Sequence, residues 1–201
     1  MATLALLRHP SAAMGYIQYG LFGWRFISGQ GLPQSHFHEL FATPKYVSID
    51  LLPTIGYLTY WDANYAKDVF YLALLGRVLS PKIVFEIGTL QGYTALLFAL
   101  NTPRDTIIYT LDLPPDDLCS PSLPTTIIDD AHITAHAHST EYLYRDHPAG
   151  TKVRQLYGDS AQFDFTPYHE KVDLFFIDGA HSYEYVRSDS LNALVCTRRG
   201  G

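Results

Sequence analysis

The sequence predicts an α/β domain in which a mostly parallel sheet carries helices on both faces. Short apolar runs rich in β-branched and aromatic residues alternate with longer segments whose apolar residues recur at helical spacing. Residues 83–112 read strand, glycine turn, helix and strand, which is one βαβ unit of about thirty residues. Each strand of this unit has an acidic residue near its carboxyl end, at the edge of a parallel sheet where ligands bind.

Local signals place the individual elements. Ser80 and Pro81 stop one long helical pattern, and the segment 101–105 breaks a second one. Gly88 and Gly92 permit a tight turn between the first strand and its helix. In chain order we expect a helix over 64–79, a strand over 83–88, a helix over 94–100, strands over 106–112, 152–157 and 172–177, and a helix over 182–197.

Two regions differ in how regular they are. Residues 1–60 lack clear periodicity and contain many glycines and prolines, so we expect them to form an N-terminal arm or cap. Residues 61–201 form the predicted ligand-binding domain. The first residues lack the basic lead-in of a signal peptide, and no apolar stretch is long enough to cross a bilayer, so we expect no membrane association.

Composition and charge exclude several classes of protein. Hydrophobic residues make up 47% and charged residues 17% of the chain, which is enough apolar surface for a sizeable core. The formal net charge is −6 and no basic stripe appears, so we expect no nucleic-acid partner. The two cysteines have no metal-type spacing, and they fit either a reducing cytoplasm or a chance placement.

The turn after the first strand indicates what the domain binds. Asp112 lies about 20 residues beyond Gly92, the distance at which dinucleotide folds place a ribose-binding acid. A pyrophosphate, however, needs three close glycines, and only Gly88 and Gly92 are present. Glu86 would repel a pyrophosphate but suits a ligand with an amino group and a positive sulfur. The sequence therefore favours S-adenosylmethionine over NAD.

A second group of polar residues follows the last predicted strand. The strand over 172–177 ends on Asp178, and Gly179 and His181 come next. Asp178 is either a cap of the following helix or a functional group at the ligand-bearing edge of the sheet, and the two roles are compatible. His181 is either a general base for a substrate hydroxyl or a structural histidine bonded to a loop carbonyl.

Four motifs together resemble a known family. EIGTLQGYT, TLDLPP, YGDSAQFDF and FIDGAHSYEYV are similar, in order and spacing, to motifs of the class I methyltransferases of bacterial family 24, which are related to cephalosporin-hydroxylase-like and catechol-type O-methyltransferases. The resemblance covers about residues 60–201 and implies a Rossmann-like fold. It implies that the methionine part of S-adenosylmethionine contacts Glu86, Gly88, Thr89 and Gly92, that Asp112 holds the ribose hydroxyls, and that Asp159 and Ser160 lie by the adenine.

The resemblance also implies chemistry at the end of the last strand. Asp178 matches the aspartate that binds a divalent ion in catechol-type enzymes, so a metal such as Mg²⁺ is expected there. Such an ion would lower the pKa of a substrate hydroxyl. His181 is the alternative group for removing the proton, because methyl transfer to oxygen needs a deprotonated nucleophile.

The end of the chain differs from the family pattern. Gly200 and Gly201 match the turn into strand five of this fold, so we expect the domain to lack strands five to seven and to be incomplete at its C-terminus. One edge of the strand over 172–177 would then be unpaired. We therefore expect marginal stability or a homodimer formed through this edge.

The predicted function is S-adenosylmethionine-dependent methylation of an oxygen on a small molecule, in the cytoplasm. One alternative is a degenerate or truncated methyltransferase that binds cofactor or a partner without turnover. A less favoured alternative is an NAD-dependent oxidoreductase, which the missing third glycine and Glu86 argue against.

Overall fold

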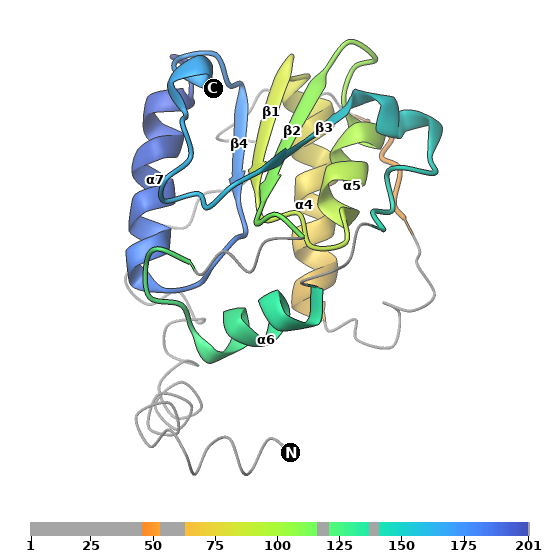
Figure 1. Ribbon diagram of the computed structural model, residues 1–201. Helices are drawn as coiled ribbons and strands as arrows, with labels where there is room; N and C mark the ends of the chain where they lie inside the picture. Colours follow the sequence, from red (N-terminus) through yellow and green to blue (C-terminus); the bar gives the residue numbers. More distant parts are fainter. Residues whose placement is uncertain (1–45, 53–62, 116–120, 137–140, 201) are drawn as a thin grey trace, which may run out of the picture. The chain divides into compact units, whose positions relative to one another are not determined.

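Figure 1 shows the computed structural model of the chain, which describes residues 46–52, 63–115, 121–136 and 141–200. These residues all belong to one compact unit. Most of the predicted N-terminal arm, residues 1–60, lies outside the described residues, so the division into arm and domain stays a prediction. No helix among the described residues is long and apolar enough to cross a membrane.

The described residues form one four-stranded sheet, and every pair of neighbouring strands is parallel. Its spatial order is β3-β2-β1-β4. The register pairs Phe85 with Tyr109 on one side and with Phe175 on the other, so β1 is an inner strand. The strands are β1 (Ile83–Ile87), β2 (Ile107–Asp112), β3 (Val153–Tyr157) and β4 (Leu174–Ile177), which confirms the four predicted strands to within two residues at each end.

Helices cover both faces of the sheet, as predicted. In Figure 1, α4 and α5 lie on one side of the strands and α7 lies on the other. The α/β, Rossmann-like fold class is therefore confirmed, with four strands in the described part of the chain. The α-helices are α4 (Ala63–Leu79), α5 (Tyr93–Asn101), α6 (Ile127–His136) and α7 (Tyr183–Cys196), and two short 3-10 helices are η1 (Pro148–Lys152) and η2 (Thr166–Tyr168).

Alternation along β1 divides the core into two clusters. Val84 packs into one cluster with the buried α5 residues Leu96 and Phe98. Phe85 points to the opposite face, where it packs with Val172 and with Cys196 at the end of α7. Because β1 is buried on both faces, its sequence is apolar at every position except Glu86 rather than alternating between apolar and polar.

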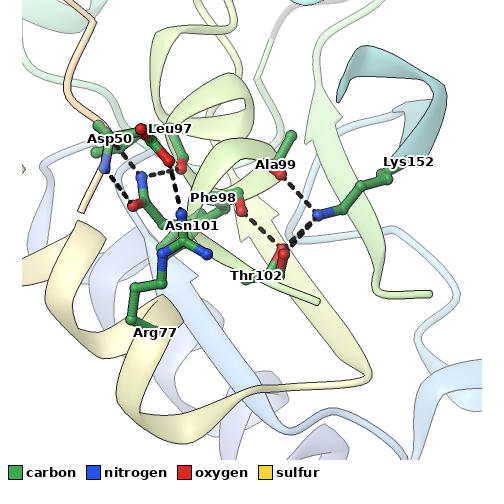
Figure 2. Close-up of polar contacts among 8 residues, drawn as sticks. All are labelled: Asp50, Arg77, Leu97, Phe98, Ala99, Asn101, Thr102 and Lys152. Carbon is green, nitrogen blue, oxygen red and sulfur yellow. Dashed lines mark hydrogen bonds and ion pairs between the residues drawn. The ribbon is translucent and has the colours of Figure 1, made fainter. Parts of the chain in front are cut away.

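The segment 46–52 is held against the helices by a buried amide. Asn101, at the end of α5, is fully buried, and its Nδ2 donates to the carbonyl oxygens of Asp50 and Leu97. Its Oδ1 accepts from the backbone N–H of Asp50 at 2.8 Å. Figure 2 shows this pair, together with the ion pair between Asp50 and Arg77. The Asn101 side chain thus bonds both the N–H and the carbonyl of Asp50, as a neighbouring strand would do in a sheet.

The C-terminal end of α5 is closed by a lysine from another element. Lys152 Nζ donates to the carbonyl oxygens of Ala99 and Thr102 and to the hydroxyl of Thr102, at 2.6, 3.0 and 2.8 Å (Figure 2). These carbonyls belong to the last turn of the helix, where intrahelical donors run out and a cation is favourable. Lys152 therefore fixes the start of β3 against the end of α5.

We expect Asn101→Ala to lower the free energy of unfolding by about 2–4 kcal/mol, because it leaves the backbone N–H and carbonyl of Asp50 without their buried partner. Asp50→Ala is the matched control. It removes only the partly exposed ion pair with Arg77, which is worth about 0–1 kcal/mol. Urea unfolding of both variants measures the difference, and equal losses would contradict the role given to Asn101.

Candidate functional site

The strand order creates a switch point between β1 and β4. After β1 the chain moves outward to β2 and then β3, and it returns to the other side of β1 to form β4. The connection after β1 leads to α5 on one face of the sheet, and the connection after β4 leads to α7 on the other (Figure 1). Ligands of open parallel sheets bind outside the carboxyl ends of the strands at such a point.

Two glycines allow the backbone to turn closely at this point. Gly88 has φ +95°, and a Cβ there would lie 2.2 Å from the carbonyl oxygen of Asp178. Gly92 has φ +74°, and a Cβ there would lie 2.6 Å from the ring of Tyr144. Both positions therefore exclude any side chain, on grounds of backbone conformation and of space. The predicted glycine turn brings the end of β1 directly against the end of β4.

Asp112 braces this turn. Its Oδ2 accepts from the backbone N–H groups of Thr89 and Leu90 at 3.1 and 2.9 Å, and its Oδ1 accepts from Leu113 N at 2.8 Å. The acid at the end of β2 therefore lies beside the glycine turn after β1, as the spacing predicts. Its role toward a ribose stays a prediction, because the contacts seen are to the protein's own backbone.

Glu86 is a deeply buried acid near the switch point, with a relative exposure of 1%. Its Oε2 accepts from the Thr110 hydroxyl at 2.6 Å. The Thr110 hydroxyl proton is engaged in this hydrogen bond. Thr110 Oγ1 therefore accepts the hydroxyl proton of Thr89, whose Oγ1 lies 2.7 Å away. Gln155 donates in turn to Thr89, and Tyr144 donates to Gln155. The result is a chain of donors that all point toward the Glu86 carboxyl.

Burial changes the protonation of this carboxyl. Desolvation raises the pKa of Glu86 to about 8, although the Thr110 hydrogen bond works against the shift. The negative charges of Asp178 and Asp112 raise the pKa further. Glu86 therefore carries a proton near neutral pH, and a cationic group placed beside it would favour the ionised form.

Asp159 and Ser160 follow β3, where the sequence places them. Asp159 accepts from Ser122 N, from Ala161 N and from the Tyr185 hydroxyl, at 2.9, 3.0 and 2.9 Å. It thus joins the loop after β3 to the segment before α6 and to α7. Ser160 is buried beside it. The adenine-binding role of this pair stays a prediction.

Asp178 and His181 lie together beyond the end of β4. Their closest atoms, Asp178 Oδ1 and His181 Nε2, are 3.9 Å apart, and their side chains are 59% and 63% exposed. This distance is too long for a hydrogen bond. His181 Nδ1 lies 2.8 Å from Asp129 Oδ1, so the ring is held from its other side.

The sequence analysis missed two acids near the site. Asp129 is buried at the start of α6, and its threonine-x-x-aspartate signal identifies a helix cap but not a partner 52 residues away. Asp189, on α7, is fully buried, and within the described parts of the chain neither of its carboxyl oxygens has a partner in full hydrogen-bond geometry, although Ser160 lies close enough to lower its pKa. Burial raises the pKa of Asp189 to about 6. Helical spacing alone does not distinguish this acid from a solvent-facing one.

The metal role implied for Asp178 finds no support among the described residues. In these parts of the chain, no group of three or more His, Cys, Asp or Glu side chains is arranged to hold a metal ion. Among the described residues, only the His181 imidazole lies within ion-pair distance of Asp178, whereas Mg²⁺ and Ca²⁺ prefer oxygen ligands. The donor set present does not fit such an ion, so no step proposed below uses one.

The fold and the site define a class of protein, an α/β domain with a glycine turn and a group of acids at its switch point. A family model described as "Methyltransferase domain" matches residues 85–201, which is more than half of the chain. The chain therefore belongs to the methyltransferase domain family, within the class I S-adenosylmethionine-dependent methyltransferases. No curated protein matches the chain.

Solved structures with a similar fold include several methyltransferases. TomG from Streptomyces achromogenes, an O-methyltransferase solved with SAM, is 18% identical, with a TM-score of 0.43 over 66% of this chain and 52% of that one. PaMTH1 from Podospora anserina, solved with SAH, is 18% identical, with a TM-score of 0.48 over 73% and 56%. Rv0187 from MTB, solved with its cofactor, is 21% identical, with a TM-score of 0.45 over 67% and 52%. The chain thus spans about half the length of these proteins.

We expect the stability of the ligand-free protein to fall as pH rises from about 4.5 to about 8. In this window the folded protein holds the Glu86 proton and the unfolded chain releases it. The free energy of unfolding falls by about 1.4 kcal/mol for each pH unit over which Glu86 is protonated only in the folded state. Glu86→Gln removes this contribution, so the variant has a shallower slope in urea unfolding across the pH range.

The control for this measurement is Glu141→Gln, which changes the same chemical group at an exposed position. It should keep the slope of the wild-type protein. If Glu86→Gln also kept that slope, Glu86 would be ionised in the folded protein at neutral pH, and the effect assigned to its burial would be wrong.

Proposed function

We propose that this protein transfers a methyl group from S-adenosylmethionine to an oxygen atom of a small molecule. The family assignment supports methyl transfer. The observation that carries the choice of cofactor is the buried Glu86 carboxyl beneath a glycine turn whose amides are already occupied by Asp112. Such a site suits a cationic ligand without phosphates.

The residues around the switch point fit the parts of this cofactor. Glu86, Gly88, Thr89 and Gly92 would receive the methionine part, whose ammonium group would stabilise the ionised form of Glu86. Asp112 would receive the ribose hydroxyls. Asp159 and Ser160 would border the adenine. When bound, the cofactor supplies a methyl group already activated by its positive sulfur.

NAD is disfavoured for a physical reason. A pyrophosphate binds through the free backbone N–H groups of a glycine turn and the following helix. Here the N–H groups of Thr89 and Leu90 donate to the Asp112 carboxylate, and a second acid, Glu86, lies under the same turn. A pyrophosphate would have to displace the negatively charged Asp112 carboxylate, and the protonated Glu86 carboxyl beneath the turn offers it no positive charge in return.

His181 is the proposed general base. The acceptor hydroxyl gives its proton to His181 Nε2, the oxygen forms a bond to the methyl carbon, and the electron pair of the broken carbon–sulfur bond stays on sulfur. The products are the methylated acceptor, S-adenosylhomocysteine and a protonated imidazole, which later releases its proton to solvent. Asp178, 3.9 Å from Nε2, would stabilise the imidazolium. Alignment of acceptor and methyl supplies much of the rate enhancement.

A second candidate function is cofactor binding without turnover. The exposure of Asp178 and His181 favours it, because the described residues by themselves do not exclude water from an acceptor placed there. In both candidates we propose a cytoplasmic protein with no nucleic-acid partner. We also propose that the outer edge of β4, which pairs only with β1 among the described strands, forms a homodimer contact.

We expect isothermal titration calorimetry to detect binding of both S-adenosylmethionine and S-adenosylhomocysteine, and none of NAD. Near pH 7 binding should release the Glu86 proton, so the measured enthalpy should change with the ionisation enthalpy of the buffer. Glu86→Gln should abolish that buffer dependence, whereas Glu141→Gln should preserve it. Failure of the wild-type protein to bind either ligand would remove the proposed function.

Turnover separates the two candidate functions. In assays with a panel of phenols, catechols and sugars, the wild-type protein should methylate at least one acceptor. His181→Gln should lower kcat by roughly 10²–10⁴-fold, because a positioned base contributes about that much, while cofactor binding stays unchanged. Binding without any turnover would favour the second candidate.

A further inference from the structure

The imidazole of His181 is held by a buried carboxylate that comes from a different part of the chain. Asp129 Oδ1 lies 2.8 Å from His181 Nδ1, and Asp129 Oδ2 accepts from the backbone N–H of His181 at 3.1 Å. The Asp129 side chain is 5% exposed, whereas the histidine ring is mostly open. One carboxylate thus binds both the ring and the backbone of the same residue.

Local sequence explains why Asp129 is available for this contact. Thr126 and Asp129 form a reciprocal cap at the start of α6. Thr126 N and Oγ1 donate to Asp129 Oδ2, and Asp129 N donates to Thr126 Oγ1. Both capping contacts of the Asp129 carboxylate use Oδ2, so Oδ1 is left to the imidazole. The cap therefore fixes the orientation of the carboxylate without occupying the oxygen that faces the ring.

The contact has a chemical consequence for the ring. The neutral imidazole carries one proton, and the hydrogen bond made by one nitrogen decides which nitrogen holds it. Burial by itself would raise the pKa of Asp129, but the hydrogen bonds from Thr126 and His181 outweigh it and hold that pKa below its ordinary value. The carboxylate is thus ionised and accepts the proton of Nδ1, so the lone pair of the ring lies on Nε2.

We propose that Asp129 is a positioning residue that holds His181 in its Nδ1–H tautomer and directs Nε2 toward the space beside Asp178. The catalytic value of this tautomer rests on the proposed function, because the hydroxyl of the methyl acceptor is the group that would give its proton to Nε2. The positioning itself is a property of the ligand-free protein and can be measured without any substrate.

The simpler role for Asp129 is the helix cap alone, and two variants separate the roles. Asp129→Asn keeps the volume of the side chain but removes the charge that fixes the Nδ1 proton. Thr126→Ala removes the cap hydroxyl, at a cost of about 0.5–2 kcal/mol, and leaves Asp129 Oδ1 on the ring. Asp130→Asn is the matched charge control, since Asp130 is the exposed neighbour and bonds Thr125 instead.

The test is ¹⁵N NMR of the full-length, histidine-labelled protein at about pH 9, where ordinary imidazoles are neutral. The chain has nine histidines, so the signals of His181 are assigned by their loss in His181→Gln. In the wild-type protein, Thr126→Ala and Asp130→Asn, we expect His181 to carry its proton on Nδ1. In Asp129→Asn we expect the proton to move largely to Nε2.

Three results would overturn the inference. The first is a wild-type His181 with its proton on Nε2, which is decisive even if Asp129→Asn does not fold. The second is a folded Asp129→Asn, verified by circular dichroism, with the wild-type tautomer. Loss of the Nδ1 proton in Thr126→Ala as strongly as in Asp129→Asn would likewise assign the effect to the cap.

Turnover measurements on the same variants test this inference separately from the proposed function. If His181 is the base, Asp129→Asn should lower kcat at least about tenfold with little change in KM, and Thr126→Ala should leave both near wild type. The expected tautomer shift without any change in kcat would sustain the positioning role and contradict the assignment of His181 as the base.

Discussion

The close contact between the ends of β1 and β4 is the constraint on which the site depends. Gly88 can lie against the carbonyl of Asp178 only because it has no side chain and adopts a positive φ. This contact closes the switch point on one side, while the glycine turn leads into α5 on the other. Glu86, Asp112 and Asp178 lie at or next to the ends of three neighbouring strands, since parallel strands bring their carboxyl ends to one edge of the sheet.

Three acids lie at this edge, and each carboxyl group has a different environment. Glu86 is buried and holds a proton near neutral pH. Asp112 is surrounded by backbone N–H groups, which satisfy its charge. Asp178 is open to solvent and lies near an imidazole. The arrangement lets three carboxyl groups lie close together with little mutual repulsion, and a positively charged ligand would be favoured there over a phosphate.

The sequence predicted the parts of the fold that depend on local pattern. β-branched and aromatic runs located the four strands of the described residues, and the spacing of Gly88, Gly92 and Asp112 predicted that the turn and the acid would meet. The features that the sequence did not predict are contacts between residues far apart in the chain. The pairing of Asp129 with His181 depends on where α6 lies, and the binding of Asp50 by Asn101 depends on how an irregular segment packs. Neither leaves a periodic signal in the sequence.

The thiol of Cys196 gives α7 a built-in probe of local unfolding. It is fully buried at the end of the helix, between the sheet and Phe165, and burial raises its pKa. The thiolate is the form that reacts with alkylating reagents, so this sulfur is protected while the helix stays docked. Once Cys119 is replaced by serine, the labelling rate would report how often the last helix opens. The helix that follows Asp178 and His181 can therefore be monitored by chemistry that leaves the site itself untouched.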